Sequence, residues 1–132
     1  MQSFEDLEVW KTGVDLADEV YELVKKLPKN EEYALSQQLR KASTAIGANV
    51  AEGYSRHTYP DKVHKFTIAR GECSEVKGLL LIALRLKLLE KIEVQKALQL
   101  CESTGRLLSG LIKYCRRQER SSTYTSPYAA SS

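Results

Sequence analysis

The segment Gln38–Gly53 constrains the fold more than any other part of this sequence. It contains no proline, and apolar or small residues recur in it three and four positions apart, as on one face of an α-helix. Alanine and glycine crowd its remaining positions, so the predicted helix is narrow on nearly every side. A solvent-facing helix usually carries long charged side chains on its outer face. We therefore expect this helix to pack inside a bundle, with room for another subunit on its other side.

Four amphipathic helices are predicted, near residues 4–27, 31–56, 60–89 and 93–117. Each carries two neighbouring apolar stripes with helical spacing. Pro28, Gly53 and the segment near Glu90 separate the helices, and Pro60 suits the first turn of the third. Short links make sequential helices antiparallel, so the predicted fold class is all-α, an antiparallel up-down-up-down four-helix bundle. The residues predicted to be buried include Trp10, Leu39, Ile46, Phe66, Leu80 and Leu108.

The composition changes after the last predicted helix. Residues 118–132 are rich in Ser, Thr and Tyr, with no apolar periodicity and no charge after Arg120, a pattern typical of disorder. We therefore predict a bundle domain at 1–117 and a disordered tail at 118–132. The first residues are acidic where a signal peptide is basic, and no apolar run approaches the roughly 18 residues of a membrane span. These features predict a cytoplasmic protein without a membrane partner.

Charge is distributed unevenly along the chain. Residues 4–27 carry seven acidic and three basic side chains, whereas residues 59–91 carry seven basic and four acidic ones, and residues 92–120 six and three. This asymmetry suits either binding of a polyanion by the C-terminal half or head-to-tail contacts between subunits, and composition does not separate the two. The basic residues predicted to contact nucleic acid are Arg56, Lys62, Lys65, Arg70, Lys77, Arg106, Lys113, Arg116, Arg117 and Arg120.

A metal site is suggested by the carboxylates and histidines Glu52, His57, His64, Glu72 and Glu75, and we weigh it against a structural role. A di-iron bundle requires two Glu-x-x-His units, and the sequence contains none. It also lacks a serine–histidine–acid constellation and a glycine-rich phosphate loop. We therefore predict no metal, no cofactor, no catalytic residue and no enzymatic activity. The structural alternative is a polar cluster that fixes the register of the helices. Its predicted members are Gln38, Arg40, Asn49, Glu52 and Glu75.

The three cysteines are predicted to be structural. Cys73, Cys101 and Cys115 show no CxxC spacing, and each falls on a predicted apolar stripe. They are expected to be buried, reduced thiols that act as small hydrophobic side chains.

Three sequence blocks carry a resemblance to a known family. The first is Phe4-x-x-Leu7-x-x-Trp10, the second is Gln38–Ala42 followed by Ile46–Gly53, and the third is Phe66-x-Ile-Ala-Arg-Gly-Glu-x-Ser-Glu75. Over residues 4–115 the chain resembles the 23S rRNA intervening-sequence proteins, which are small bacterial four-helix bundles. The family usually has proline at the position of Gly47 and serine at the position of Glu72. The first departure implies a helix less kinked than in relatives, and the second adds a carboxylate.

The resemblance implies an assembly and a set of partners. Such bundles are left-handed and assemble as rings, commonly homopentamers. The family is similar to the accessory variability protein of diversity-generating retroelements, a basic pentamer that binds nucleic acid and partners a reverse transcriptase. By this analogy the expected function is that of a non-catalytic, nucleic-acid-associated accessory protein, with structured RNA or a reverse-transcriptase complex as partner. The alternative is a scaffold ring that binds another protein and no nucleic acid.

Overall fold

The protein is an all-α bundle. The computed structural model describes the backbone of residues 3–131 and the side chains of residues 3–121. Within this part, the chain forms four α-helices and two short 3-10 helices, η1 and η2. They are η1 (Phe4–Asp6), α1 (Glu8–Val24), η2 (Lys29–Glu31), α2 (Leu35–Ser55), α3 (Tyr59–Arg85) and α4 (Lys91–Ser131). The predicted all-α fold with four packed helices is confirmed.

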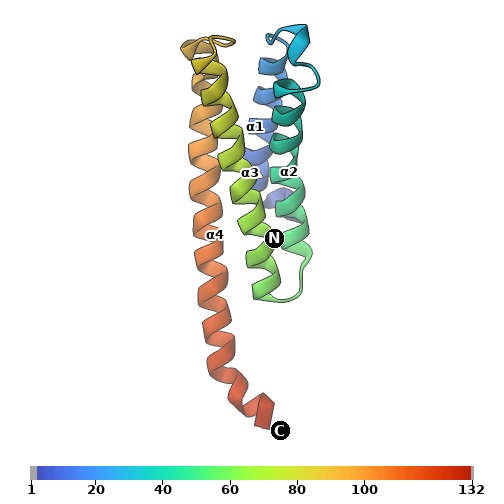
Figure 1. The fold of residues 1–132 in the computed structure, drawn as a ribbon. Coiled ribbons are helices and arrows are strands. Elements are labelled where there is room, and N and C mark those ends of the chain that lie inside the picture. Colours follow the sequence, from blue (N-terminus) through green and yellow to red (C-terminus); the bar gives the residue numbers. More distant parts are fainter. Residues whose placement is uncertain (1–2, 132) are drawn as a thin grey trace.

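The helices alternate in direction around a square. The α1–α2 and α3–α4 connections lie at one end of the bundle and the α2–α3 connection at the other (Figure 1). Helix α1 packs against α2 and α4, and α3 also packs against α2 and α4, so α1 and α3 are diagonal neighbours. This is the up-down-up-down order expected for short connections. No described helix combines the length and the apolar character that crossing a bilayer requires.

Side-chain caps mark the starts of η1 and α3, whereas α1 and α2 begin without a side-chain cap hydrogen bond. Ser3 accepts a hydrogen bond from the Glu5 N–H at 3.2 Å, but it caps η1, so α1 begins four residues later than predicted. Helix α2 likewise begins late, because residues 29–31 form a 3-10 turn instead of its first turn. In α3, the Thr58 hydroxyl accepts the Asp61 N–H at 3.2 Å, and Pro60 lies in the first turn as predicted.

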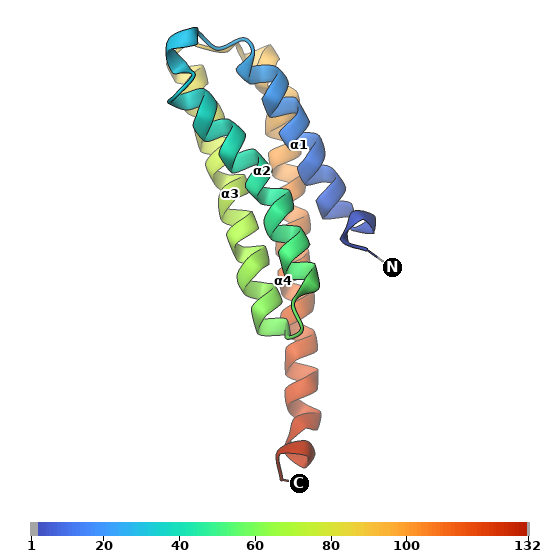
Figure 2. The ribbon, with the colours of Figure 1, turned by 90° about the vertical axis from the view of Figure 1, so that its right-hand side faces the viewer.

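Helix α4 extends beyond its predicted end. It continues to Ser131 and passes below the other three helices (Figures 1 and 2). Residues 116–120 are Arg, Gln and Glu, which favour helix, so no local signal stops the helix at residue 117. The predicted end at 117 is therefore wrong. The disordered tail over 118–132 stays a prediction, and Ser132 lies outside the described residues.

The core lies between the inward faces of the four helices. Five of the six predicted core residues are buried, namely Leu39, Ile46, Phe66, Leu80 and Leu108. Trp10 is only half-buried, so the prediction for it is wrong. Helix α1 turns the stripe of Val9, Leu16 and Val20 inward, which leaves Trp10 at its edge, with its ring 5.4 Å from that of Phe4. The three cysteines are buried and free, as predicted.

Thr104 is a polar residue on the inner face of α4. Its side chain is fully buried, and its hydroxyl lacks a hydrogen-bond partner among the described residues. Because an unpaired buried hydroxyl is costly and valine has the same shape, we expect Thr104→Val to raise the free energy of unfolding by about 1 kcal/mol in urea denaturation.

Thr12→Val provides the matched control for Thr104→Val. The Thr12 hydroxyl donates a hydrogen bond to the Glu8 carbonyl at 2.9 Å near the surface, so its replacement should bring no such gain. An unchanged or lower stability of Thr104→Val would show that the buried hydroxyl has a partner, such as an internal water.

Candidate functional site

The predicted nucleic-acid-binding residues divide into two groups. The first consists of side chains that form ion pairs or hydrogen bonds with other groups of the same chain. Lys65 on α3 pairs with Glu52 on α2 at 2.9 Å, and Arg56 lies 3.8 Å from the same carboxylate. The hydrogen bond from Lys65, followed by its charge, lowers the pKa of Glu52. Lys62 donates to the Tyr54 carbonyl at 2.7 Å and to the Gly53 carbonyl at 3.4 Å, which closes the C-terminal end of α2.

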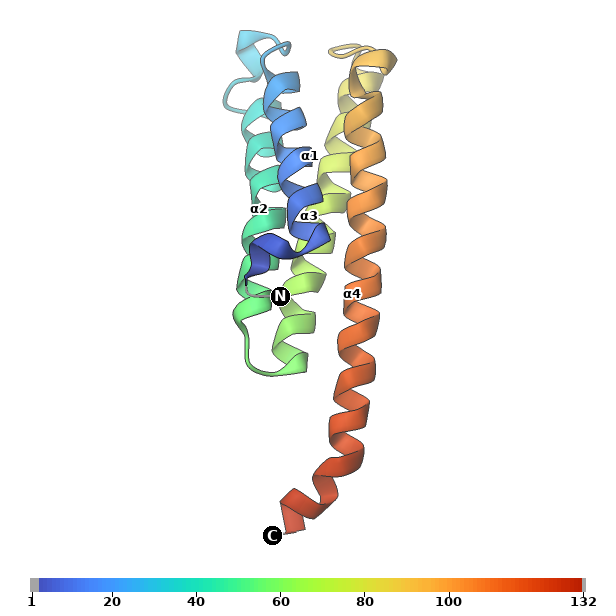
Figure 3. The ribbon, with the colours of Figure 1, turned by 180° about the vertical axis from the view of Figure 1, so that it is seen from behind.

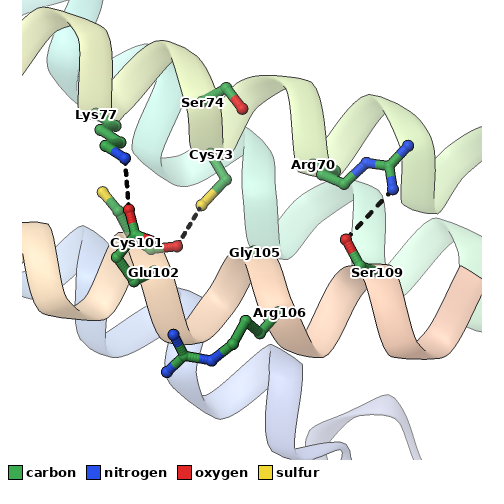
Figure 4. A pocket seen from close by; sticks show the side chains of 9 residues that line it. All are labelled: Arg70, Cys73, Ser74, Lys77, Cys101, Glu102, Gly105, Arg106 and Ser109. Carbon is green, nitrogen blue, oxygen red and sulfur yellow. Dashed lines mark hydrogen bonds and ion pairs between the residues drawn. The ribbon is translucent and has the colours of Figure 1, made fainter.

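Two further members of this group bridge α3 to α4. Arg70 donates to the Ser109 hydroxyl at 3.3 Å, and Lys77 forms an ion pair with Glu102 (Figure 4). The hydrogen bond between Lys77 and Glu102 is the main reason that the pKa of Lys77 is raised and the pKa of Glu102 is lowered. These contacts hold two helices together. The four predicted α3 cations, Lys62, Lys65, Arg70 and Lys77, are therefore each bound to a group of the same chain and do not form an unoccupied basic face.

The second group lies along the outward side of α4. Arg106, Lys113 and Arg120 are spaced seven residues apart, and Arg116 and Arg117 flank them. Seven residues make nearly two helical turns, so the three lie on one face about 10.5 Å apart. All five are exposed, and none forms an ion pair with a described residue. We refer to these five residues as the α4 basic stripe.

The acidic helix α1 neighbours only one end of the stripe. Arg106 lines a hollow between α1 and α4 together with Glu8 and Asp15. Figure 3 shows that α1 begins part-way along α4, so the rest of α4 continues past it. The acidic helix α1 thus lies beside α4 at Arg106, and the part of α4 that follows Arg106 continues past α1.

A surface cavity of about 570 Å³ lies between α3 and α4. Cys73 of α3 and Cys101 of α4 lie in its wall, and the Cys73 thiol donates a hydrogen bond to the Cys101 carbonyl at 3.3 Å (Figure 4). Sequence reasoning missed this pair because it treated the cysteines one by one. The pair could have been found by aligning the apolar stripes of the two antiparallel helices, because each stripe contains one of the two cysteines.

Comparisons with known proteins agree with this architecture. The model of the 23S rRNA-intervening sequence protein family matches residues 5–110. The chain belongs to this family. A solved structure from Bacteroides thetaiotaomicron, a protein with unknown function from the S23 ribosomal protein family, matches with a TM-score of 0.74 and 24% sequence identity. The match covers 80% of this chain and 98% of that one, and at this identity it shows a shared fold. No curated protein matches.

The predicted polar cluster does not form in this family member. Arg40 instead pairs with Glu32 at 2.9 Å, and the Asn49 amide donates to the Ala45 carbonyl of its own helix at 2.8 Å. Gln38, Glu52 and Glu75 are exposed. Fourteen residues separate Gln38 from Glu52, which places them about 21 Å apart along α2, too far to meet. The prediction of a cluster of these five side chains is therefore wrong.

The carboxylates weighed as metal ligands are also dispersed. Within the described part of the chain, no three side chains of His, Cys, Asp or Glu gather closely enough to hold a metal ion. Glu72 is half-buried on α3. Burial raises its pKa, and the charge of Glu75 adds to this shift, while Lys41 opposes it. The absence of a metal, a cofactor and a catalytic residue stays a prediction.

Proposed function

We propose that this family member is a non-catalytic, nucleic-acid-associated accessory protein that contacts phosphates through the α4 basic stripe. The observation that carries the proposal is the contrast between the two groups of cations. The predicted cations of α3 and of the α2–α3 connection form ion pairs or hydrogen bonds with Glu52, Glu102, Ser109 or backbone carbonyls. Those of the stripe are exposed and aligned on one helix face.

The spacing of the stripe fits a polyanion with a regular repeat. Successive members at about 10.5 Å span about three base-pair steps of 3.4 Å. Long Arg and Lys side chains on a helix surface can neutralise phosphates without reading bases, so binding is weakly sequence-selective. Each neutralised phosphate releases condensed counterions, which makes the affinity fall steeply with salt.

The assembly is part of the same proposal. A homopentameric ring, as the family resemblance implies, would repeat the stripe and bind a polyanion with avidity. Exposed apolar side chains on α1 and at the α3–α4 turn support subunit contacts; Val14, Tyr21, Ile82, Leu86 and Ile92 are 41–73% exposed in the single chain. A structured RNA or a reverse-transcriptase complex is the proposed partner. The same apolar side chains favour the alternative, a scaffold ring that binds only protein.

The test is the replacement of Arg116 and Arg117 together by Ala. Fluorescence anisotropy with a structured RNA and a duplex DNA, at several salt concentrations from about 50 to 200 mM, measures the affinity. We expect the double variant to bind both more weakly. For duplex DNA, the slope of log affinity against log salt should shrink by about 1.8, because two phosphate contacts are lost.

Lys25→Ala with Lys29→Ala is the matched control for this test. It removes the same charge from two exposed residues of the α1–α2 connection, which lies at the opposite end of the bundle from the C-terminal half of α4 (Figure 1). This variant should bind like the parent protein, and light scattering should give all three proteins the same mass. Equal weakening by both pairs would indicate a general charge effect without a defined interface. Failure of the parent to bind either nucleic acid at about 50 mM salt would favour the scaffold alternative.

A further inference from the structure

Cys73 and Cys101 form a thiol pair between two helices. They are 28 residues apart in sequence, and the sulfur of Cys73 lies 3.3 Å from the backbone carbonyl oxygen of Cys101. The side chain of Cys73 therefore already reaches the residue that carries the second thiol. Each residue is only 3% exposed, which shields the pair from large reagents.

The surface cavity gives a small oxidant a route to this pair. Both cysteines line it, whereas Ser74, Lys77 and Ser109, which also line it, are exposed. Gly105 widens the cavity, because a Cβ atom there would meet nothing within 4 Å. Hydrogen peroxide is about the size of water, so a cavity of about 570 Å³ admits it readily.

We propose that Cys73 and Cys101 are a peroxide-oxidised pair that forms a reversible disulfide between α3 and α4. The Cys73 thiolate attacks one oxygen of hydrogen peroxide, the O–O bond breaks, and the leaving hydroxide takes up a proton to become water. The Cys101 sulfur then attacks the sulfenic sulfur of Cys73 and displaces the second oxygen as water. Two thiols and one peroxide thus give one disulfide and two waters.

The surroundings distinguish the roles of the two thiols. Once Cys73 loses its proton, it accepts a hydrogen bond from the Cys101 thiol, and this bond is the main cause that lowers the pKa of Cys73 and raises that of Cys101. Burial and the charge of Glu102 oppose this lowering of the Cys73 pKa, and the ammonium group of Lys77 adds a smaller lowering. Cys73 is therefore the attacking thiol, and Cys101 is the resolving thiol. Cys115 takes no part in the pair; it is buried with Phe66 and Ile112 in a separate cluster.

The test uses the full-length reduced protein, treated with hydrogen peroxide and then alkylated under denaturing conditions. The parent should lose two hydrogen atoms in intact mass, and its alkylatable thiols should fall from three to one. Peptide mapping should join the peptides that contain residues 73 and 101, and dithiothreitol should restore all three thiols. This measurement needs no variant, so it decides the proposal even if a substitution impairs folding.

Variants then separate the two steps. Cys101→Ser should stop at the sulfenic acid of Cys73, which dimedone labels, whereas Cys73→Ser should form neither species. The matched control Cys115→Ser should form the bridge as the parent does. Three alkylatable thiols after peroxide treatment, or a bridge that involves residue 115, would overturn the proposal.

Discussion

The Gly53→Ala variant is expected to be less stable than the parent by about 1–3 kcal/mol in urea denaturation. A Cβ atom built at Gly53 would lie 2.5 Å from Cε1 and 2.8 Å from Cδ1 of Phe66. Phe66 is only 2% exposed and packs with Ile112 and Cys115, so its ring has little room to withdraw. Alanine normally stabilises a helix relative to glycine by about 0.5–1 kcal/mol, so the clash must outweigh this gain.

Gly47→Ala is the matched control on the same helix. Its Cβ would meet the Trp10 Nε1 at 3.6 Å, an ordinary van der Waals contact, so helix propensity should prevail and raise stability by up to about 1 kcal/mol. Adding Phe66→Leu to Gly53→Ala should cost less than the sum of the two separate substitutions, because the smaller side chain relieves the clash. A Gly53→Ala protein as stable as Gly47→Ala would show that the ring of Phe66 moves aside freely.

Leu39→Ala should have the largest effect, a loss of about 2–5 kcal/mol of unfolding free energy. Leu39 is fully buried on α2 within the main hydrophobic core. Truncation there removes buried apolar atoms and leaves a cavity that the surrounding helices fill only partly. Chemical denaturation of both proteins measures the difference, and an unchanged slope against denaturant would confirm that the cause is stability alone.

Leu86→Ala serves as the control for this core substitution. Leu86 has the same side chain but is 61% exposed just after α3, so its truncation should cost less than about 1 kcal/mol in the isolated chain. A Leu39→Ala loss below about 1 kcal/mol would show that the core around α2 closes over the missing atoms.

The fold could be predicted from the sequence because apolar residues recur with helical spacing. Leu39, Ile46, Leu80 and Leu108 were assigned to the core from their spacing, and all four are fully buried. Trp10 was not assigned correctly because α1 carries two adjacent apolar stripes. Spacing locates both stripes but does not say which of them turns inward, since that depends on how α2 and α4 approach.

The candidate site could be predicted from the sequence only in part. Its basic residues are visible in the sequence, but whether each is free depends on its neighbours in space. Lys65 meets Glu52 from another helix, and Lys77 meets Glu102, whereas Lys113 meets no described acid. The sequence also contains no local signal that ends α4 at residue 117, because residues 116–120 favour helix.

The sequence by itself determined four amphipathic helices and most of the core, because these follow from the periodicity of single segments, and it determined the antiparallel order, because the links between helices are short. Only the tertiary structure decided that Gly53 faces Phe66, that Lys65 and Lys77 of α3 are paired with carboxylates, and that Cys73 lies against Cys101. The physical reason is that such contacts depend on the axial shift and rotation of one helix relative to another. The packing of the whole core sets both quantities, and no single helix encodes them.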